Sequence, residues 1–114
     1  MSDITAFAPL YTVTGTNAGT LIPSVTLAAT ASSQAIQLPS GQGTNQIQIA
    51  NQGTTWAFVN FGIFGSTPAA TVAGSYPVAP GTVRTVGIAA EVTGATCILA
   101  SSTGSVTFTR GNGL

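Results

Sequence analysis

The chain has 114 residues, a length typical of one domain, and a formal net charge of zero. Only 4% of its residues are charged, where about 25% is usual. His and Lys are absent, which excludes a Ser-His or Cys-His pair and Schiff-base chemistry. Two separated carboxylates and one Cys make neither a glycosidase pair nor a zinc site. We therefore expect no enzyme activity, metal or cofactor, and with two Arg as the only cations we expect no nucleic-acid binding.

The same lack of charge bears on assembly. A net charge near zero removes the repulsion that keeps copies of a protein apart, and Lys residues commonly protect exposed sheet edges from pairing. This chain has no Lys, so its edges are covered either by its own chain or by a partner, and we favour a partner.

The sequence gives no sign of export or of a membrane span. Its first residues carry no basic cluster and no long apolar run follows them, so we expect no signal peptide. The most apolar window, residues 56–64, is too short to cross a bilayer.

Residues 1–23 show no clear period and are interrupted by Pro and Gly. The segment contains four large apolar anchors, Ile4, Phe7, Leu10 and Tyr11. It is either a flexible terminus with a first strand or an extended arm whose anchors are buried on a neighbouring subunit. We therefore divide the chain into an extended arm or irregular segment, 1–23, and a β-sandwich domain, 24–114.

Strand patterns recur from residue 24 onward. Residues 24–29, 35–38 and 46–50 are predicted strands, and in the last of these Ile47 and Ile49 face inward while the two Gln residues face outward. The turn residues 51–53 predict a β-hairpin with the following strand, 54–64. That strand is apolar on both faces, which predicts a central position in a sheet or one face against a partner, and we expect Trp56 in the core.

The second half of the chain continues the pattern. Strands are predicted at 70–73, 83–89, 96–100 and 105–110, and the two prolines of 76–81 predict an edge strand or a connection. Pro80-Gly81 fits a type II turn, with a positive φ at Gly81. About eight short antiparallel strands and no helical period predict an all-β, single-domain β-sandwich, and the Pro-containing connections favour a jelly-roll-like arrangement.

Three residues of this half are candidates for a protein interface. Arg84 and Arg110 each share strand parity with apolar neighbours near a strand end. Their heads either reach water past the rim of the core or meet a carboxylate on a partner. Tyr76 lies next to a proline in the predicted edge segment and is the third candidate, whereas Cys97 is expected to be a buried structural thiol.

Residues 45–113 resemble a known family through three segments. The segments are residues 47–62 (IQIANQGTTWAFVNFG), 76–81 (YPVAPG) and 104–113 (GSVTFTRGNG). In that order they resemble small virion proteins of tailed bacteriophages, of the capsid cement or decoration type. The resemblance implies a homo-oligomer, a dimer or trimer, that staples neighbouring major capsid subunits on the outer shell. Its location would be the virion surface, after synthesis in the host cytoplasm.

A second function stays open at this point. Small β-domains also occur in phage tails, fibres and adhesins, where they bind receptors or glycans. That function predicts exposed aromatic side chains and few copies per particle, whereas a cement protein is present in many copies.

Overall fold

The computed structural model describes residues 7–9, 24–39, 45–89 and 91–113, which form nine strands and no helix. None of these residues belongs to a helix long and apolar enough to cross a membrane. The strands are β1 (Phe7–Pro9), β2 (Ser24–Ala29), β3 (Gln34–Gln37), β4 (Gln46–Asn51), β5 (Ala57–Gly62), β6 (Tyr76–Val78), β7 (Val83–Gly87), β8 (Gly94–Leu99) and β9 (Gly104–Gly113). The all-β prediction is confirmed, with one more strand than the eight expected.

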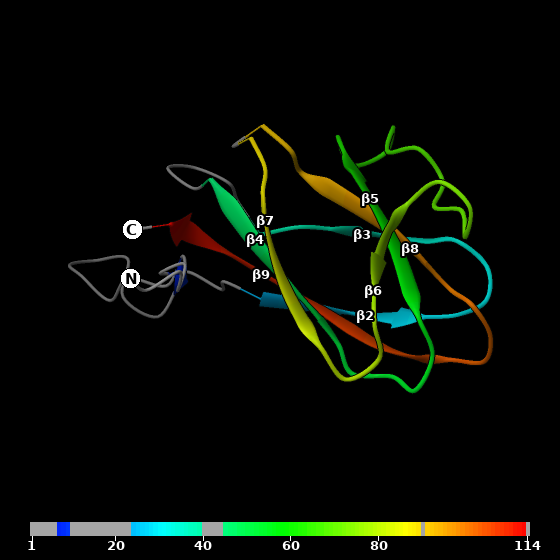
Figure 1. Ribbon diagram of the computed structural model, residues 1–114. Coiled ribbons are helices and arrows are strands. Elements are labelled where there is room, and N and C mark those ends of the chain that lie inside the picture. Colours follow the sequence, from blue (N-terminus) through cyan, green and yellow to red (C-terminus); the bar gives the residue numbers. More distant parts are fainter. Residues whose placement is uncertain (1–6, 10–23, 40–44, 90, 114) are drawn as a thin grey trace.

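The strands form two antiparallel sheets that pack face to face (Figure 1). The first sheet has the order β2-β9-β4-β7, and β1 extends it by pairing with the far end of β9. The second sheet has the order β3-β8-β5-β6. This is the strand order of a jelly roll, so the predicted architecture is confirmed.

The connections explain why the strand order is hard to read from the sequence. Along β2 to β9 the chain passes from one sheet to the other at every step except between β5 and β6, which pair with each other. Neighbours in the sequence are therefore rarely neighbours in a sheet.

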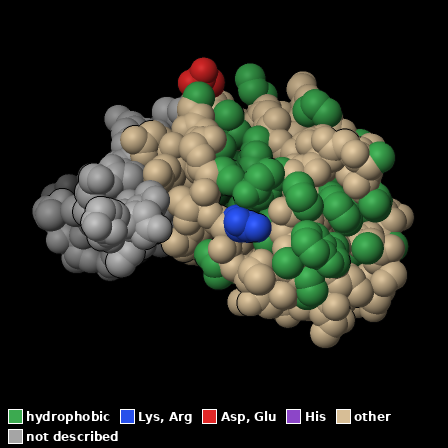
Figure 2. All heavy atoms as spheres, viewed as in Figure 1, with side chains coloured by type: hydrophobic (Ala, Val, Ile, Leu, Met, Phe, Trp, Pro, Cys, Tyr) green, Lys and Arg blue, Asp and Glu red, His purple; other side chains and the backbone are tan. Residues whose placement is uncertain are grey.

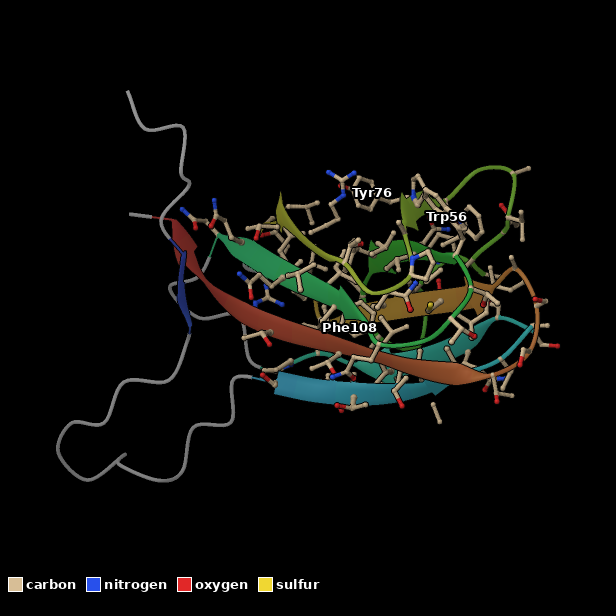
Figure 3. All side chains as sticks on the ribbon, turned by 60° about the horizontal axis from the view of Figure 1, so that its bottom comes forward. Trp56, Tyr76 and Phe108 are labelled. Atoms are coloured by element: carbon tan, nitrogen blue, oxygen red, sulfur yellow. The ribbon has the colours of Figure 1, made fainter. Side chains whose placement is uncertain are left out.

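The core lies between the two sheets and follows the alternation of the strands. β4 buries every second side chain, with Ile47 and Ile49 pointing inward as predicted. Phe108 of β9 meets Phe61 of β5 edge to face, with ring centroids 6.2 Å apart. Figure 3 shows Phe108 within the sandwich, between the two layers. β5 lies between β8 and β6, so the central position predicted for the doubly apolar strand is confirmed.

The predicted hairpin at residues 51–53 is wrong, because β4 and β5 belong to different sheets. Asn51 ends β4 with a buried side chain that fixes this corner. Its amide donates to the carbonyls of Thr55, at 2.9 Å, and Val78, at 3.0 Å, and its Oδ1 accepts from the Gly53 N–H. Every polar atom of this amide is thus used to turn the chain into the second sheet.

The strand predicted at residues 70–73 is also absent, since these residues lie in the loop between β5 and β6. Polar side chains hold this loop against the second sheet. The Thr96 hydroxyl donates to the Pro68 carbonyl at 2.6 Å, and the Asn60 amide donates to the Ala69 carbonyl at 3.1 Å. Ala70 in this loop is buried, and its N–H donates to the Ser33 hydroxyl at 2.9 Å.

Candidate protein-interaction surface

On one side of the sandwich, which we call the open side, the two sheets end in β7 and β6, whereas on the other side they end in β2 and β3. β7 pairs only with β4 and β6 pairs only with β5, so both are edge strands. Residues 79–82 join them, and Gly81 in this loop has the predicted positive φ, 72°. Figure 1 shows β6 and β7 running along the same side of the molecule. The expectation that 76–81 forms an edge strand or a connection is confirmed.

Four residues of these two strands form a surface that we call the edge patch: Tyr76, Pro77, Val83 and Arg84. All four are exposed, Tyr76 to 39% and Val83 to 56%. Lys is absent and Arg110 is fully buried, so the single cation visible in Figure 2 is Arg84. Figure 2 shows hydrophobic side chains gathered around it. The edge patch is thus an apolar surface with one cation.

Strand register explains why Tyr76 and Arg84 reach solvent. Tyr76 is opposite Val59 and Arg84 is opposite Ile49, and both of those partners point into the core. Opposite residues of an antiparallel pair share a face, so Tyr76 and Arg84 lie on the inward face of their strands. At the open side their long side chains extend past the rim of the core to water.

Apolar side chains continue from the edge patch onto the outer face of the second sheet. Phe58 is half-buried and lies opposite both Ile98 and Pro77. Trp56, just before β5, is 48% exposed, so the expectation that it lies in the core is wrong. Figure 3 places Trp56 and Tyr76 on the same side of the sandwich. The sequence predicted an apolar outer face for this strand but not that Trp56 would remain exposed.

The outer face of the first sheet is polar and uncharged. The Ser24 and Thr109 hydroxyls lie 2.7 Å apart, and those of Thr26 and Thr107 lie 2.9 Å apart. The Thr107 hydroxyl also donates to the side-chain oxygen of Gln52 at 2.9 Å. These bonds link β2 and β9, so the hydroxyls of Ser24, Thr26, Thr107 and Thr109 are bonded within the chain.

Arg110 differs from Arg84 in its exposure and in its hydrogen bonds. Its side chain is 0% exposed, and its guanidinium donates to the carbonyls of Val92, at 2.5 Å, and Ala89, at 2.9 Å. Burial lowers the pKa of Arg110. The expectation that its head reaches water is wrong, because the strand carries it inward, where it holds the loop between β7 and β8. This engagement leaves its side chain no exposed surface for the interface role predicted from the sequence.

Cys97 lies in β8 with a fully buried side chain, as expected for a structural thiol. Burial raises its pKa to about 11, while a backbone hydrogen bond at Phe58 acts in the opposite direction. The thiol is therefore protonated and unreactive at neutral pH.

The remaining predicted interface residues fall in the N-terminal segment. Ile4, Leu10 and Tyr11 lie outside the described residues, and Phe7 begins β1, whose backbone pairs with Gly113 of β9. The arm remains a prediction. The structure brings Tyr76 and Arg84 together in the edge patch and adds Val83 and Pro77, which the sequence analysis did not single out.

The described residues contain no pocket and no group of three His, Cys, Asp or Glu residues that could hold a metal ion. Their distinctive feature is the open side of the sandwich rather than a cleft.

The sequence matches no protein-family model and no curated protein. Among solved structures, the chain is similar to PirA, with 12% identity, a TM-score of 0.53, and coverage of 78% of this chain and 94% of that chain. Likeness at this identity concerns the fold alone. Two weaker overlaps are a protein of the disulfide-linked pili of Bacillus endospore appendages and the coat protein of Tobacco streak virus. The pilus protein has 18% identity and a TM-score of 0.45, with coverage of 80% of this chain and 83% of that chain. The coat protein has 11% identity and a TM-score of 0.35, with coverage of 81% of this chain and 87% of that chain.

Proposed function

We propose that this chain is a structural virion protein of the capsid cement type. In this role it forms a homo-oligomer and binds the outer surface of a shell, where it staples neighbouring major capsid subunits. The observation that carries the proposal is the edge patch, an exposed apolar surface on a jelly-roll sandwich whose polar faces carry almost no charge.

The surface chemistry supports attachment to protein. Desolvating a charged group costs far more than desolvating a hydroxyl or an amide that keeps its hydrogen bonds. On the outer face of the first sheet, the hydroxyls of Ser24 and Thr109 already bond to each other. A partner can therefore cover this face without stripping water from charged groups.

The edge patch supplies the apolar area that such a contact needs. Tyr76 and Val83 are large and exposed, and Arg84 of β7 is the one cation of the patch. Tyr and Arg are enriched in protein interfaces, since both combine apolar area with polar contacts. On a lattice, many copies of a weak contact give strong attachment.

The test is the number of copies on purified particles, measured by quantitative gel and by cryo-EM. A cement protein is expected at a fixed, high ratio to the major capsid protein, on the outer surface. A low copy number confined to one vertex or to the tail would contradict the proposal.

The N-terminal arm is a separate part of the proposal. Removing residues 1–22 is expected to weaken attachment to capsids, because the anchors Ile4, Phe7, Leu10 and Tyr11 would be lost. Normal attachment of the truncated chain would remove the arm from the account while leaving the edge patch in it.

A receptor- or glycan-binding module of a tail, fibre or adhesin is the second candidate. The exposure of Trp56, together with Tyr76 on the same side, favours it, because exposed aromatic rings offer apolar faces to a sugar. Glycan-array binding that disappears in Trp56→Ala and persists in Phe64→Ala would favour this candidate. Phe64 is a matched control because it is an equally exposed aromatic outside the strands.

A further inference from the structure

We propose that β7 is the self-association edge of this protein, where it pairs antiparallel with β7 of a second copy around a two-fold axis. In this arrangement Thr85 faces the partner subunit's Thr85. The inference rests on the assembly part of the proposed function and names the surface that performs it.

The hydrogen bonds of β7 show which of its backbone groups face outward. Asn51 N–H donates to the Thr82 carbonyl at 3.0 Å, and Ile88 N–H donates to the Asn45 carbonyl at 3.0 Å. In an antiparallel pair the bonded residues alternate, so Arg84 and Val86 also direct their backbone groups toward β4. Between them, the backbone groups of the odd-numbered residues 83, 85 and 87 point away from the sheet, into the open side.

The outward-facing residues are all exposed, and none carries a charge. Edge strands are usually protected by Lys, by Pro or by a covering segment. Val83, Thr85 and Gly87 provide no such protection, and Val83 adds an exposed apolar side chain. Val83, Thr85 and Gly87 therefore offer three outward-facing backbone positions, at every second residue, with which another strand can pair.

Other described edges are less suited to this role. β6 has three residues, and its Pro77 lacks a backbone N–H. β3 has four residues. β2 is longer, but none of the large exposed hydrophobic residues lies on it. Among these edges, only β7 has both an uninterrupted series of outward-facing backbone groups and residues of the apolar edge patch.

A second copy is the occupant because the row is self-complementary. Placing Thr85 opposite the partner subunit's Thr85 sets Val83 opposite the partner's Gly87, so that a large side chain meets a residue without one. The backbone groups of all three outward-facing residues then form hydrogen bonds to the partner strand in both copies. A shift by one pair toward Arg84 would place Arg84 directly opposite the partner's Arg84, which like-charge repulsion disfavours. A shift by one pair toward Val86 would leave Val83 without a bonded partner in β7. Closed two-fold dimers are also the commonest homo-oligomers.

The first test uses the full chain in sedimentation and light scattering across a range of concentrations. The wild type is expected to dimerise. Thr85→Pro removes an N–H that the chain's own ladder does not use, and Thr85→Lys places two cations opposite each other, so each should raise the dimer dissociation constant at least tenfold. Gln37→Lys is the matched control, because it adds the same charge to an exposed residue of the β3 edge, and its dimer should persist.

The second test reads the register and does not depend on a variant that weakens folding. Thr85→Cys should form a disulfide-linked dimer under mild oxidation, because opposite bonded residues have Cα atoms about 5.5 Å apart, within disulfide range. Val83→Cys should not, since the two copies of Val83 would be four residues apart along the strand, roughly 13 Å. Cys97 is buried and does not compete.

The inference is overturned by a wild type that stays monomeric throughout, by dimers that survive both Thr85 substitutions, or by equal cross-linking of the two Cys variants. These results are separate from the capsid test. A β7 dimer that does not coat capsids would overturn the proposed function alone, and a chain that coats capsids but associates through another surface would overturn this inference alone.

Discussion

The two arginines lie in two regions of the molecule that give a cation opposite surroundings. Inside the sandwich, Arg110 is buried and donates to two carbonyls of the loop between β7 and β8. At the open side, Arg84 is exposed among apolar side chains. Both residues share strand parity with apolar neighbours, so parity alone does not separate them. The difference is position: Arg110 lies on a strand with neighbours on both sides, and Arg84 lies on an edge.

This difference separates stability from assembly. Groups inside the sandwich hold the fold together, and their loss should lower the free energy of unfolding. Groups on the open side are in contact with solvent in the single chain, so their loss should leave folding nearly unchanged and act on association.

Arg110→Ala gives the largest expected loss of stability, about 3 kcal/mol. It removes two charge-assisted hydrogen bonds and empties the space of a fully buried side chain. Arg84→Ala is the matched control and should change the free energy of unfolding by less than about 0.5 kcal/mol. Urea denaturation of both variants measures the contrast, and equal losses would contradict the distinction between the regions.

Gly94→Ala should follow, with a loss of about 2 to 3 kcal/mol. A Cβ at Gly94 would lie 2.6 Å from the Phe64 Cα, a backbone atom that cannot move aside cheaply. Gly81→Ala, in the loop at the open side, meets no atom within 4 Å and should cost about 1 to 2 kcal/mol through its positive φ alone. Thermal denaturation compares the two, and a greater loss at Gly81 would count against the crowding described at Gly94.

The buried thiol gives a pH-dependent test of the packed interior. Because the pKa of Cys97 rises from 9.0 to about 11 on folding, the folded chain holds this proton more tightly than the unfolded chain does. The contribution of this thiol to the free energy of unfolding is fully present below about pH 9. It falls by about 1.4 kcal/mol per pH unit as the pH rises from there to about 11. Denaturation midpoints measured over this range should fall more steeply for the wild type than for Cys97→Ala. Parallel slopes would show that the thiol is not buried.

Tyr76→Ala is expected to cost only about 1 kcal/mol of folding free energy, because the residue is 39% exposed. It should nevertheless weaken binding to purified capsids. Phe64→Ala removes an exposed aromatic outside the edge patch and serves as control. Capsid co-sedimentation measures both, and equal binding by the two variants would remove Tyr76 from the proposed contact.

Much of the fold follows from alternation in the sequence. β2 spans the predicted residues, and β4 buries its two Ile residues as expected, because a half-buried strand must place apolar groups on one face. The predicted hairpin fails at Asn51, because turn residues show that the chain bends but not whether the next strand pairs or crosses to the other sheet. The buried hydrogen bond that fixes this corner is donated by the Asn51 amide to the carbonyl of Val78, a residue far along the chain.

The candidate surface was predicted only in part for a similar reason. Tyr76 was found because Pro77 marks an edge, whereas Val83 looks like any strand residue until its sheet is known to end there. The residue type of Trp56 predicts a core position, yet it lies just before β5 and is 48% exposed. Exposure at a sheet edge depends on strand order, which periodicity does not contain.

Hydrogen exchange at the amides of β7, followed by NMR, tests the central claim most directly. In a single sandwich, the amides of Arg84 and Val86 should be protected by β4, and those of Val83, Thr85 and Gly87 should exchange freely. As the concentration rises and the chain associates, the account predicts that all five become protected. An alternating pattern that persists in the associated protein would contradict it.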